Sequence, residues 1–205
     1  MKVLNFTNHI IKSSMKIDLP EIFKDKTVYV VASGESLKGF DFERLRDRNV
    51  IVVNDVCKYV LFAQVLVALD PGWYTRNKPY LHKFTGLRIT KCGKGRPGWN
   101  YFIDQGMSED KLVLRNAINS GLYAMVAAIK LGASKIYLLG FDVTWKKQPY
   151  FYDSTQAQID EYRNGMHRKD AHLRYFDYYK DYNIVNASPD SAITCFPKCS
   201  LDDIL

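Results

Sequence analysis

The chain has 205 residues, of which 47% are apolar and 25% are charged, and its formal net charge is +7. This length suits one ordinary domain with a single core, and the composition excludes a disordered or fibrous protein. No apolar run is long enough to cross a bilayer and the first residues form no signal-peptide pattern, so we expect a cytoplasmic protein without a transmembrane segment. The spacing of the four cysteines is not that of a zinc site, which favours free thiols and no bound metal. They are Cys57, Cys92, Cys195 and Cys199.

The positive charge favours an acidic ligand. Lysines and arginines are densest in Lys83–Arg96 and in Arg163–Arg174. A nucleotide, a phosphorylated sugar or a nucleic acid would suit such clusters, and a solvated basic surface explains each cluster equally simply. The charge therefore narrows the ligand class without choosing within it.

Strand and helix patterns alternate along the chain from Lys26, after an N-terminal extension over residues 1–25. The predicted strands are Thr27–Ala32, Val50–Val53, Gln64–Leu69, Leu87–Thr90, Lys135–Leu139 and Asn183–Asn186. The predicted helices are Phe42–Asp47, Ser120–Leu131 and His167–Asp181. Near-continuous apolar strands in such an alternation predict an α/β fold, namely a single Rossmann-like domain over residues 26–205 whose mainly parallel sheet has helices on both faces. Residues 143–166 show little apolar periodicity and are predicted to form a small lid.

The first predicted strand runs into the polar turn Ser33-Gly34-Glu35-Ser36, and an amphipathic helix pattern follows it. A strand, a tight turn and a helix in this order present backbone N–H groups and a helix N-terminus to an anion. The same sequence pattern also occurs in plain connectors.

Polar residues also follow the second and third predicted strands and the predicted strand that ends at Leu139. They are Asn54-Asp55, Asp70-Pro71 and Gly140-Phe141-Asp142. The carboxyl ends of parallel strands meet at one edge of a sheet, so together these side chains predict a ligand site there. Each residue taken alone also suits a strand end or a helix cap.

Asn119-Ser120-Gly121 precedes the most apolar helix pattern in the chain. Its N-terminus offers free N–H groups, a hydroxyl and the positive end of the helix dipole. The segment therefore predicts a phosphate site, with an ordinary N-cap as the alternative.

Two groups near the predicted lid have side chains suited to catalysis. His167 stands just before the last predicted helix and is a candidate general base, and His172 is a weaker one. Tyr150 and Tyr152 could donate hydrogen bonds to a leaving phosphate, although lid packing also explains them.

In order and spacing, these motifs resemble those of the bacterial sialyltransferases of glycosyltransferase family 42. More distantly, they resemble the Rossmann-like proteins grouped with the hydroxymethylpterin pyrophosphokinases. The family's opening turn, Gly-Asn-Gly-Pro-Ser-Leu, is similar to residues 32–37, and its Thr-Ser-Gly phosphate turn is similar to residues 119–121. Its Gly-Ile-Asp-Phe-Tyr strand end is similar to residues 140–144.

Single positions of the family also have counterparts. Its nucleotide-binding asparagine aligns with Asn54, and an Asn-Pro pair aligns with Asp70-Pro71. Its lid tyrosine aligns with Tyr150, and its catalytic histidine aligns with His167. The resemblance covers about residues 26–201, apart from the stretch between Asp70 and Arg115.

The resemblance implies a metal-independent, cofactor-free transfer of a sugar, with inversion, from a nucleotide-sugar such as CMP-sialic acid. The implied partners are that donor and a glycan or other hydroxyl acceptor. His167 would be the general base, and Tyr150 would stabilise the departing phosphate. The implied nucleotide-binding residues are Ser33, Gly34, Ser36, Asn54, Asp70, Asn119, Ser120, Gly121, Gly140, Phe141, Asp142 and Thr144.

The chain departs from the family at three of these positions. Thr144 replaces a tyrosine at the leaving group and lacks the reach of a phenol. Asp70 replaces an asparagine, and Asn119 replaces a threonine. These changes bear on the identity of the donor and on catalysis.

Two other functions fit the same motifs. The first is an Mg²⁺-dependent pyrophosphokinase or nucleotidyl-type enzyme, in which Asp55, Asp70 and Asp142 hold the metal. The second is a non-catalytic relative that binds a nucleotide or, as a less favoured partner, nucleic acid.

Overall fold

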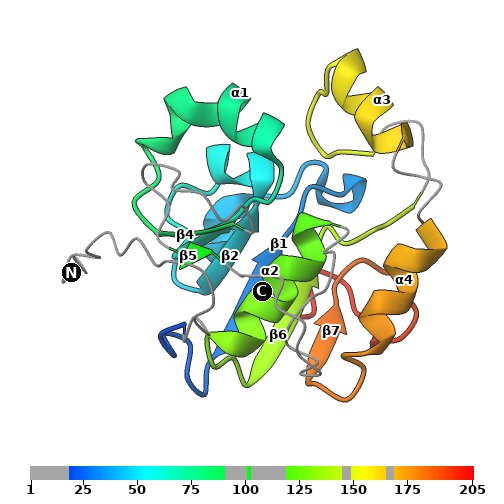
Figure 1. Cartoon of the computed structure of the whole chain (residues 1–205). Coiled ribbons are helices and arrows are strands. Elements are labelled where there is room, and N and C mark those ends of the chain that lie inside the picture. Colours follow the sequence, from blue (N-terminus) through cyan, green and yellow to red (C-terminus); the bar gives the residue numbers. More distant parts are fainter. Residues whose placement is uncertain (1–18, 91–100, 103–118, 145–148, 165–168) are drawn as a thin grey trace.

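The computed structural model describes residues 19–90, 101–102, 119–144, 149–164 and 169–205 (Figure 1). Within these residues one sheet has seven strands in the order β5-β4-β3-β2-β1-β6-β7, and every neighbouring pair is parallel. The strands are β1 (Thr27–Val31), β2 (Asn49–Val53), β3 (Val65–Val67), β4 (Leu87–Thr90), β5 (Tyr101–Phe102), β6 (Lys135–Leu139) and β7 (Ile184–Asn186). The predicted α/β fold with a parallel sheet is therefore confirmed.

Four α-helices and three 3₁₀ turns accompany the sheet in the described residues. The helices are α1 (Pro71–Leu81), α2 (Ser120–Lys130), α3 (Gln156–Asn164) and α4 (Lys169–Asp177). The 3₁₀ turns are η1 (Glu35–Leu37), η2 (Phe42–Leu45) and η3 (Asn54–Lys58). None of the described helices is both long and apolar enough to span a membrane.

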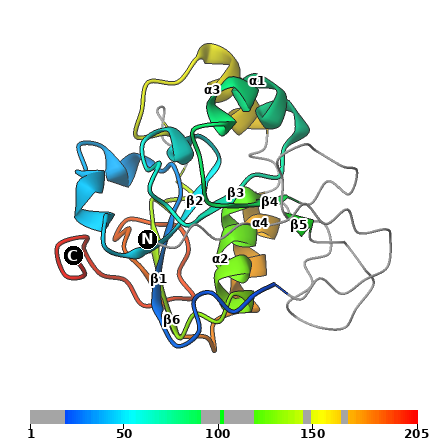
Figure 2. The same ribbon diagram turned by 90° about the vertical axis from the view of Figure 1, so that its left-hand side faces the viewer.

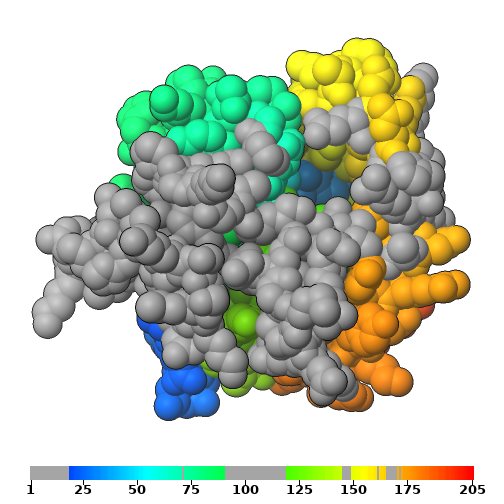
Figure 3. All heavy atoms as spheres, in the orientation of Figure 1, coloured from blue at the N-terminus to red at the C-terminus, as the bar shows by residue number. Residues whose placement is uncertain are grey.

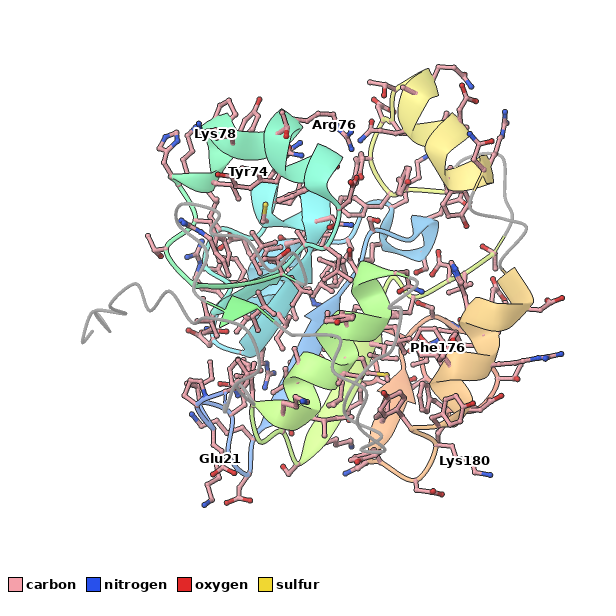
Figure 4. All side chains as sticks on the ribbon, viewed as in Figure 1. Glu21, Tyr74, Arg76, Lys78, Phe176 and Lys180 are labelled. Atoms are coloured by element: carbon pink, nitrogen blue, oxygen red, sulfur yellow. The ribbon has the colours of Figure 1, made fainter. Side chains whose placement is uncertain are left out.

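Both faces of the sheet are covered, as predicted for buried parallel strands. On one face, alternate strand residues such as Val30 and Ile51 pack with α2 and with Phe176 of α4, which lies between α2 and α4 in Figure 4. On the other face, Val31 and Val52 pack with α1 and the 3₁₀ turns. Figure 2 shows these layers from a second direction.

The predicted strands agree with the observed ones to within two residues at each end, and the prediction of α2 is similarly close. The amphipathic helix predicted after β1 is wrong. The stretch predicted as a helix over Phe42–Asp47 forms only the 3₁₀ turn η2, which Gly39, with φ +78°, separates from η1. Helices α1 and α3 and strand β5 were not predicted, and α4 ends at Asp177, before the predicted end at Asp181.

The strand order reverses between β1 and β6. After β1 the chain adds β2 to β5 on one side, and it then returns to place β6 and β7 on the other side. Ligands of open α/β sheets bind outside the carboxyl ends of the strands at such a reversal. In Figure 1 these ends point upward, toward α1 and α3.

Candidate functional site

The segments that follow β1 and β6 are in direct contact at the point of reversal. The Gly34 N–H donates to the Gly140 carbonyl oxygen at 2.9 Å. A Cβ at position 34 would lie 2.5 Å from that oxygen and 2.6 Å from Asp142 Cγ. Gly140 itself has φ +70°, which L side chains rarely adopt. Both glycines are therefore required by this close approach.

The Asp142 carboxylate holds the turn after β1. It is buried and accepts from the Ser36 backbone N–H at 2.8 Å and from Ser36 Oγ at 2.5 Å. The Leu37 N–H donates to the Gly34 carbonyl oxygen. Three N–H groups of the turn, those of Gly34, Ser36 and Leu37, are thus used inside the protein. Residues 33–37 therefore line the carboxyl edge of the sheet, and none of these three N–H groups is available to bind an anion.

Asn54 follows β2 in a conformation that favours a ligand contact. Its φ is +50°, which places a non-glycine residue in the left-handed region. Its Oδ1 atom is buried and has no hydrogen-bond partner among the described residues. A buried amide oxygen without a donor is unfavourable, so this atom is suited to accept from a bound molecule.

Asp70 follows β3 and is the N-cap of α1. Its carboxylate accepts from the N–H groups of Gly72 at 2.7 Å and Trp73 at 3.2 Å. Arg76 pairs with it at 3.5 Å and lies on the side of α1 that faces α3 (Figure 4). The half-exposed guanidinium of Arg76 therefore lies at the carboxyl edge of the sheet. It is next to Asp70, which stands where the sialyltransferases that the sequence resembles have an asparagine.

The N-terminus of α2 lies at the same edge. Asn119 is the N-cap, and its side chain accepts from the Leu122 N–H at 2.7 Å. Ser120 Oγ accepts from the Leu69 N–H, just after β3, at 3.4 Å. A Cβ at Gly121 would come 3.1 Å from the ring of Phe141, just after β6. The positive end of this buried helix is therefore placed between the ends of β3 and β6.

Residues 149–164, which we call the lid segment, cross over the end of β1. Tyr150 forms an antiparallel bridge with Gly34, and the Phe151 N–H donates to the Ser33 carbonyl oxygen at 3.1 Å. The ring of Tyr150 stacks on that of Tyr152, with centroids 5.3 Å apart and planes 6° apart.

Tyr162, from α3, was not singled out by the sequence. Its hydroxyl donates to the backbone carbonyl of Thr144 at 2.6 Å, and its ring meets that of Tyr150 edge-on at 5.8 Å. Burial, together with the nearby Asp142 carboxylate, raises the pKa of Tyr162 to about 12. A phenol thus lies beside the position where the family has a tyrosine and this chain has Thr144.

Asp55 connects the lid segment to the rest of the edge. Its buried carboxylate accepts from Trp73 Nε1 at 3.2 Å and pairs with Lys58 Nζ at 2.7 Å. It also accepts from Tyr152 Oη and Gln158 Nε2, both at 3.3 Å. Burial and the Asp55 charge raise the pKa of Tyr152, so this phenol stays protonated and able to donate.

The three carboxylates proposed to hold Mg²⁺ do not form one cluster. Asp55 is engaged by the four donors just described, Asp70 caps α1, and Asp142 holds Ser36. Across the described ranges there is no group of three or more histidine, cysteine, aspartate or glutamate side chains placed to hold a metal ion. In the structure these three aspartates therefore make structural contacts at the carboxyl edge of the sheet.

Two hollows open at this edge. One, of about 160 Å³, is lined by Lys38 and residues 150–154. The other, of about 270 Å³, is lined by Glu35, Ser36, Lys38, Asp142, Thr144, Ser188, Pro189 and Asp190. Figure 3 shows the surface hollowed between the green atoms of α1 and the yellow atoms of α3, with blue atoms of the early chain at its bottom.

The structure thus gathers most of the residues predicted for the site at one edge of the sheet. The segments after β1, β2, β3 and β6, the start of α2 and Tyr150 all lie there. The candidate base His167 lies outside the described residues, as do residues 91–96 of the first basic cluster. The sequence offered no signal for Tyr162 or for the connecting role of Asp55, because their partners are distant along the chain.

Comparisons with known proteins agree with this architecture. No protein-family model matches the sequence, and no curated protein is significantly similar to it in sequence. Among solved structures, the sialyltransferase CstII from Campylobacter jejuni in complex with cytidine-5'-monophosphate is similar, with a TM-score of 0.55 and 19% identity over 86% of each chain. The α-2,3-sialyltransferase Cst-I from the same organism gives a TM-score of 0.54 and 16% identity over 90% of this chain and 84% of that one.

A third similar structure is the MAf glycosyltransferase from Magnetospirillum magneticum AMB-1, with a TM-score of 0.56 and 16% identity. The match covers 89% of this chain and 34% of that larger one. At these identities the comparisons establish a shared fold. The resemblance to the sialyltransferases of glycosyltransferase family 42 is therefore confirmed at the level of the fold.

Proposed function

We propose that this protein is a glycosyltransferase that transfers a sugar from a nucleotide-sugar, with a CMP-sugar favoured, to an acceptor hydroxyl. The observation that carries the proposal is the placement of Asn54 and of the α2 N-terminus at one edge of the sheet. One offers an unsatisfied acceptor for a base, and the other offers a positive helix end for a phosphate. The solved structures of the same fold include CstII with CMP, with CMP-3FNeuAc and with a trisaccharide acceptor.

The donor's base is the part that Asn54 would recognise. Its Oδ1 accepts hydrogen bonds only, and cytosine carries an exocyclic amino group where uracil carries a carbonyl oxygen. A cytosine amino group therefore satisfies the buried oxygen, whereas the carbonyl oxygen that uracil carries at the same ring position cannot donate to it. A binding site discriminates most strongly against a ligand that leaves one of the site's buried polar groups without a hydrogen bond.

The donor's phosphate is assigned to the start of α2. Ser120 and Gly121 stand in the first turn, where the backbone N–H groups lack partners within the helix. Arg76 adds a cation at the same edge. These groups stabilise the negative charge that grows on the phosphate as the sugar departs.

The transfer itself is a single displacement. The acceptor oxygen forms a bond to the anomeric carbon while the bond from that carbon to the phosphate oxygen breaks, which inverts the configuration. The nucleoside monophosphate leaves with the electron pair, and His167 takes the proton of the acceptor hydroxyl. Tyr150 donates its phenolic proton in a hydrogen bond to the departing phosphate, while the Tyr162 hydroxyl holds the backbone of Thr144.

The test is a thermal-shift panel of CMP, UMP, AMP, GMP and CMP-sugars, each with and without Mg²⁺ and EDTA. CMP at 100 times its dissociation constant should stabilise the protein by about 2.7 kcal/mol, and UMP by much less. CMP-sugar turnover in EDTA should persist. A preference for purine nucleotides, or activity that requires Mg²⁺, would contradict the proposal and favour the pyrophosphokinase-like alternative.

A matched pair of variants tests the general base. His167→Ala should abolish transfer and leave CMP binding intact. His82→Ala is the control, because His82 is exposed at the end of α1. Full activity in His167→Ala would remove His167 from the mechanism.

A further inference from the structure

We propose that Asp55 is a positioning residue for this transfer, and that its carboxylate sets the lid segment against the nucleotide side of the edge. The inference rests on the proposed function for its catalytic consequence. The geometry that carries it is independent of any activity.

The two oxygens of Asp55 face different parts of the molecule. Oδ1 accepts from Trp73 Nε1 of α1 and pairs with Lys58 Nζ of η3. Oδ2 accepts from Tyr152 Oη and from Gln158 Nε2 of α3. One oxygen is thus bound to the elements that follow β2 and β3, and the other is bound to the lid segment alone.

The cost of burying this charge explains why the arrangement is specific. A buried carboxylate is unfavourable unless it is paired and its lone pairs are satisfied. Lys58 supplies the opposite charge at 2.7 Å, and the three neutral donors fill the remaining acceptor sites. Lifting the lid segment would remove the two donors on Oδ2, so the carboxylate itself favours the seated lid.

Asp55 links the proposed base contact to the proposed leaving-group contact. It directly follows Asn54, whose left-handed backbone and buried Oδ1 mark the base position. Its partner Tyr152 stacks face to face on Tyr150, at 5.3 Å. Asp55 therefore orients the Tyr150 ring through Tyr152, while the bridge between Tyr150 and Gly34 holds the Tyr150 backbone. A small displacement of such a group lowers the rate more than it lowers binding.

Asp55→Asn is the central variant, because it preserves the shape of the side chain and removes its charge. We expect kcat for sugar transfer to fall about 10- to 100-fold with CMP affinity nearly unchanged. Tyr152→Phe should lower kcat in the same direction by less. The double variant should be no worse than Asp55→Asn alone, because both changes break the same link. Asp160→Asn is the control, since Asp160 is an exposed carboxylate of α3.

A direct readout comes from the indole N–H of Trp73, one of three tryptophans in the chain. Its ¹H–¹⁵N signal is assigned with Trp73→Phe. We expect Tyr152→Phe to shift this signal although Tyr152 belongs to the lid segment, because the two donors share one carboxylate. We also expect Asp160→Asn to leave it in place.

The outcomes separate the two proposals. An unmoved Trp73 signal in Tyr152→Phe overturns the link whatever the activity is. A lower melting temperature in Asp55→Asn with kcat unchanged overturns the positioning role and leaves a purely structural one. Wild-type protein that neither binds CMP nor uses any CMP-sugar overturns the proposed function, while a shifted Trp73 signal still supports the link.

Discussion

The strand-end region and the lid segment meet at the same edge, but the lid segment is joined to it by fewer backbone bonds than join the strands to one another. In the strand-end region the parallel sheet pairing and backbone bonds such as Gly34 to Gly140 act together with the Asp70 and Asn119 caps and with the bonds from Ser36 to Asp142. The lid segment is joined to this region by two backbone contacts, at Tyr150 and Phe151, and by side chains that bind Asp55 97 and 103 residues away along the chain.

This difference teaches where the site is rigid and where it can respond to a ligand. Parallel sheet pairing opens only when much of the domain unfolds, whereas an element held by a few bonds opens at lower free energy. The strand-end region, where we propose that the donor binds, is therefore preformed, and Tyr150 and Tyr152 lie on the part that can move away from it. The predictions below perturb first the preformed edge and then the lid segment.

Gly34→Ala should give the largest loss of stability. The added Cβ meets the Gly140 carbonyl oxygen at 2.5 Å and Asp142 Cγ at 2.6 Å, and neither a backbone oxygen nor a buried carboxyl group can retreat easily. We expect the free energy of unfolding to fall by about 3 kcal/mol, measured by urea denaturation.

Gly39→Ala is the control for this variant. A Cβ at Gly39 meets no atom within 4 Å, and only its φ of +78° opposes the change, so a loss of about 1 kcal/mol is expected. Equal losses in the two variants would show that the turns after β1 and β6 are not closely packed.

Asp142→Asn should cost about 2 kcal/mol, because the Ser36 N–H and hydroxyl would lose a charged acceptor. The matched control is Asp190→Asn, since Asp190 borders the same hollow and is exposed, and its loss should stay within about 0.5 kcal/mol. Unfolding in urea measures both variants. A loss at Asp190 as large as that at Asp142 would remove Asp142 from the role of holding the turn.

The sequence predicted the strand-end region well because its elements have local signals. Strands such as Thr27–Val31 and Asn49–Val53 are nearly continuous apolar runs, and Asn119 precedes an apolar helix as an N-cap should. The same patterns placed Asn54 and Asp70 at strand ends, where the structure has them.

The lid segment could not be predicted in this way. Helix α3 is mainly polar and has no apolar stripe, and it is attached through Gln158 to a distant aspartate. Helix α1 was not predicted for a different reason: Gly72 and Pro79 lower the helix propensity of its sequence. The helix forms nevertheless, with the Asp70 cap and Pro71 at its start. Asp55 gave a signal only as one more acidic residue after a strand. Lys58 is a local i,i+3 partner, but the role of Asp55 depends on Trp73, Tyr152 and Gln158, which no local pattern reveals.

Asn119→Ala should have a smaller effect, confined to the start of α2. Losing the hydrogen bond from the Leu122 N–H to the Asn119 side chain should cost about 1 kcal/mol. Asn119→Ser should restore most of the stability, because serine is an equally good N-cap. If the first turn of α2 holds the phosphate, CMP affinity in thermal shift should fall with Asn119→Ala and recover with Asn119→Ser. A stable Asn119→Ala variant with normal CMP affinity would place the phosphate elsewhere.

Tyr162→Phe should have the smallest effect at neutral pH, where it removes one hydrogen bond to the Thr144 carbonyl, worth about 1 kcal/mol. Its informative consequence appears in alkali. The pKa of Tyr162 is raised from 10.0 to about 12 by burial and by Asp142, so in this window the unfolded chain releases a proton that the folded chain keeps. The unfolded state then binds fewer protons, and the free energy of unfolding falls as the pH rises from about 10 toward about 12.

The variant lacks this contribution, so its stability should fall less steeply than that of the wild type over the same range. Other tyrosines and lysines add the same slope to both proteins, and the difference between the two urea-unfolding series isolates Tyr162. Parallel curves would mean that the Tyr162 phenol is in contact with water and that α3 does not cover Asp142. The lid segment would then be open in the free protein, and the contrast between a preformed edge and a seated lid would hold only with the donor bound.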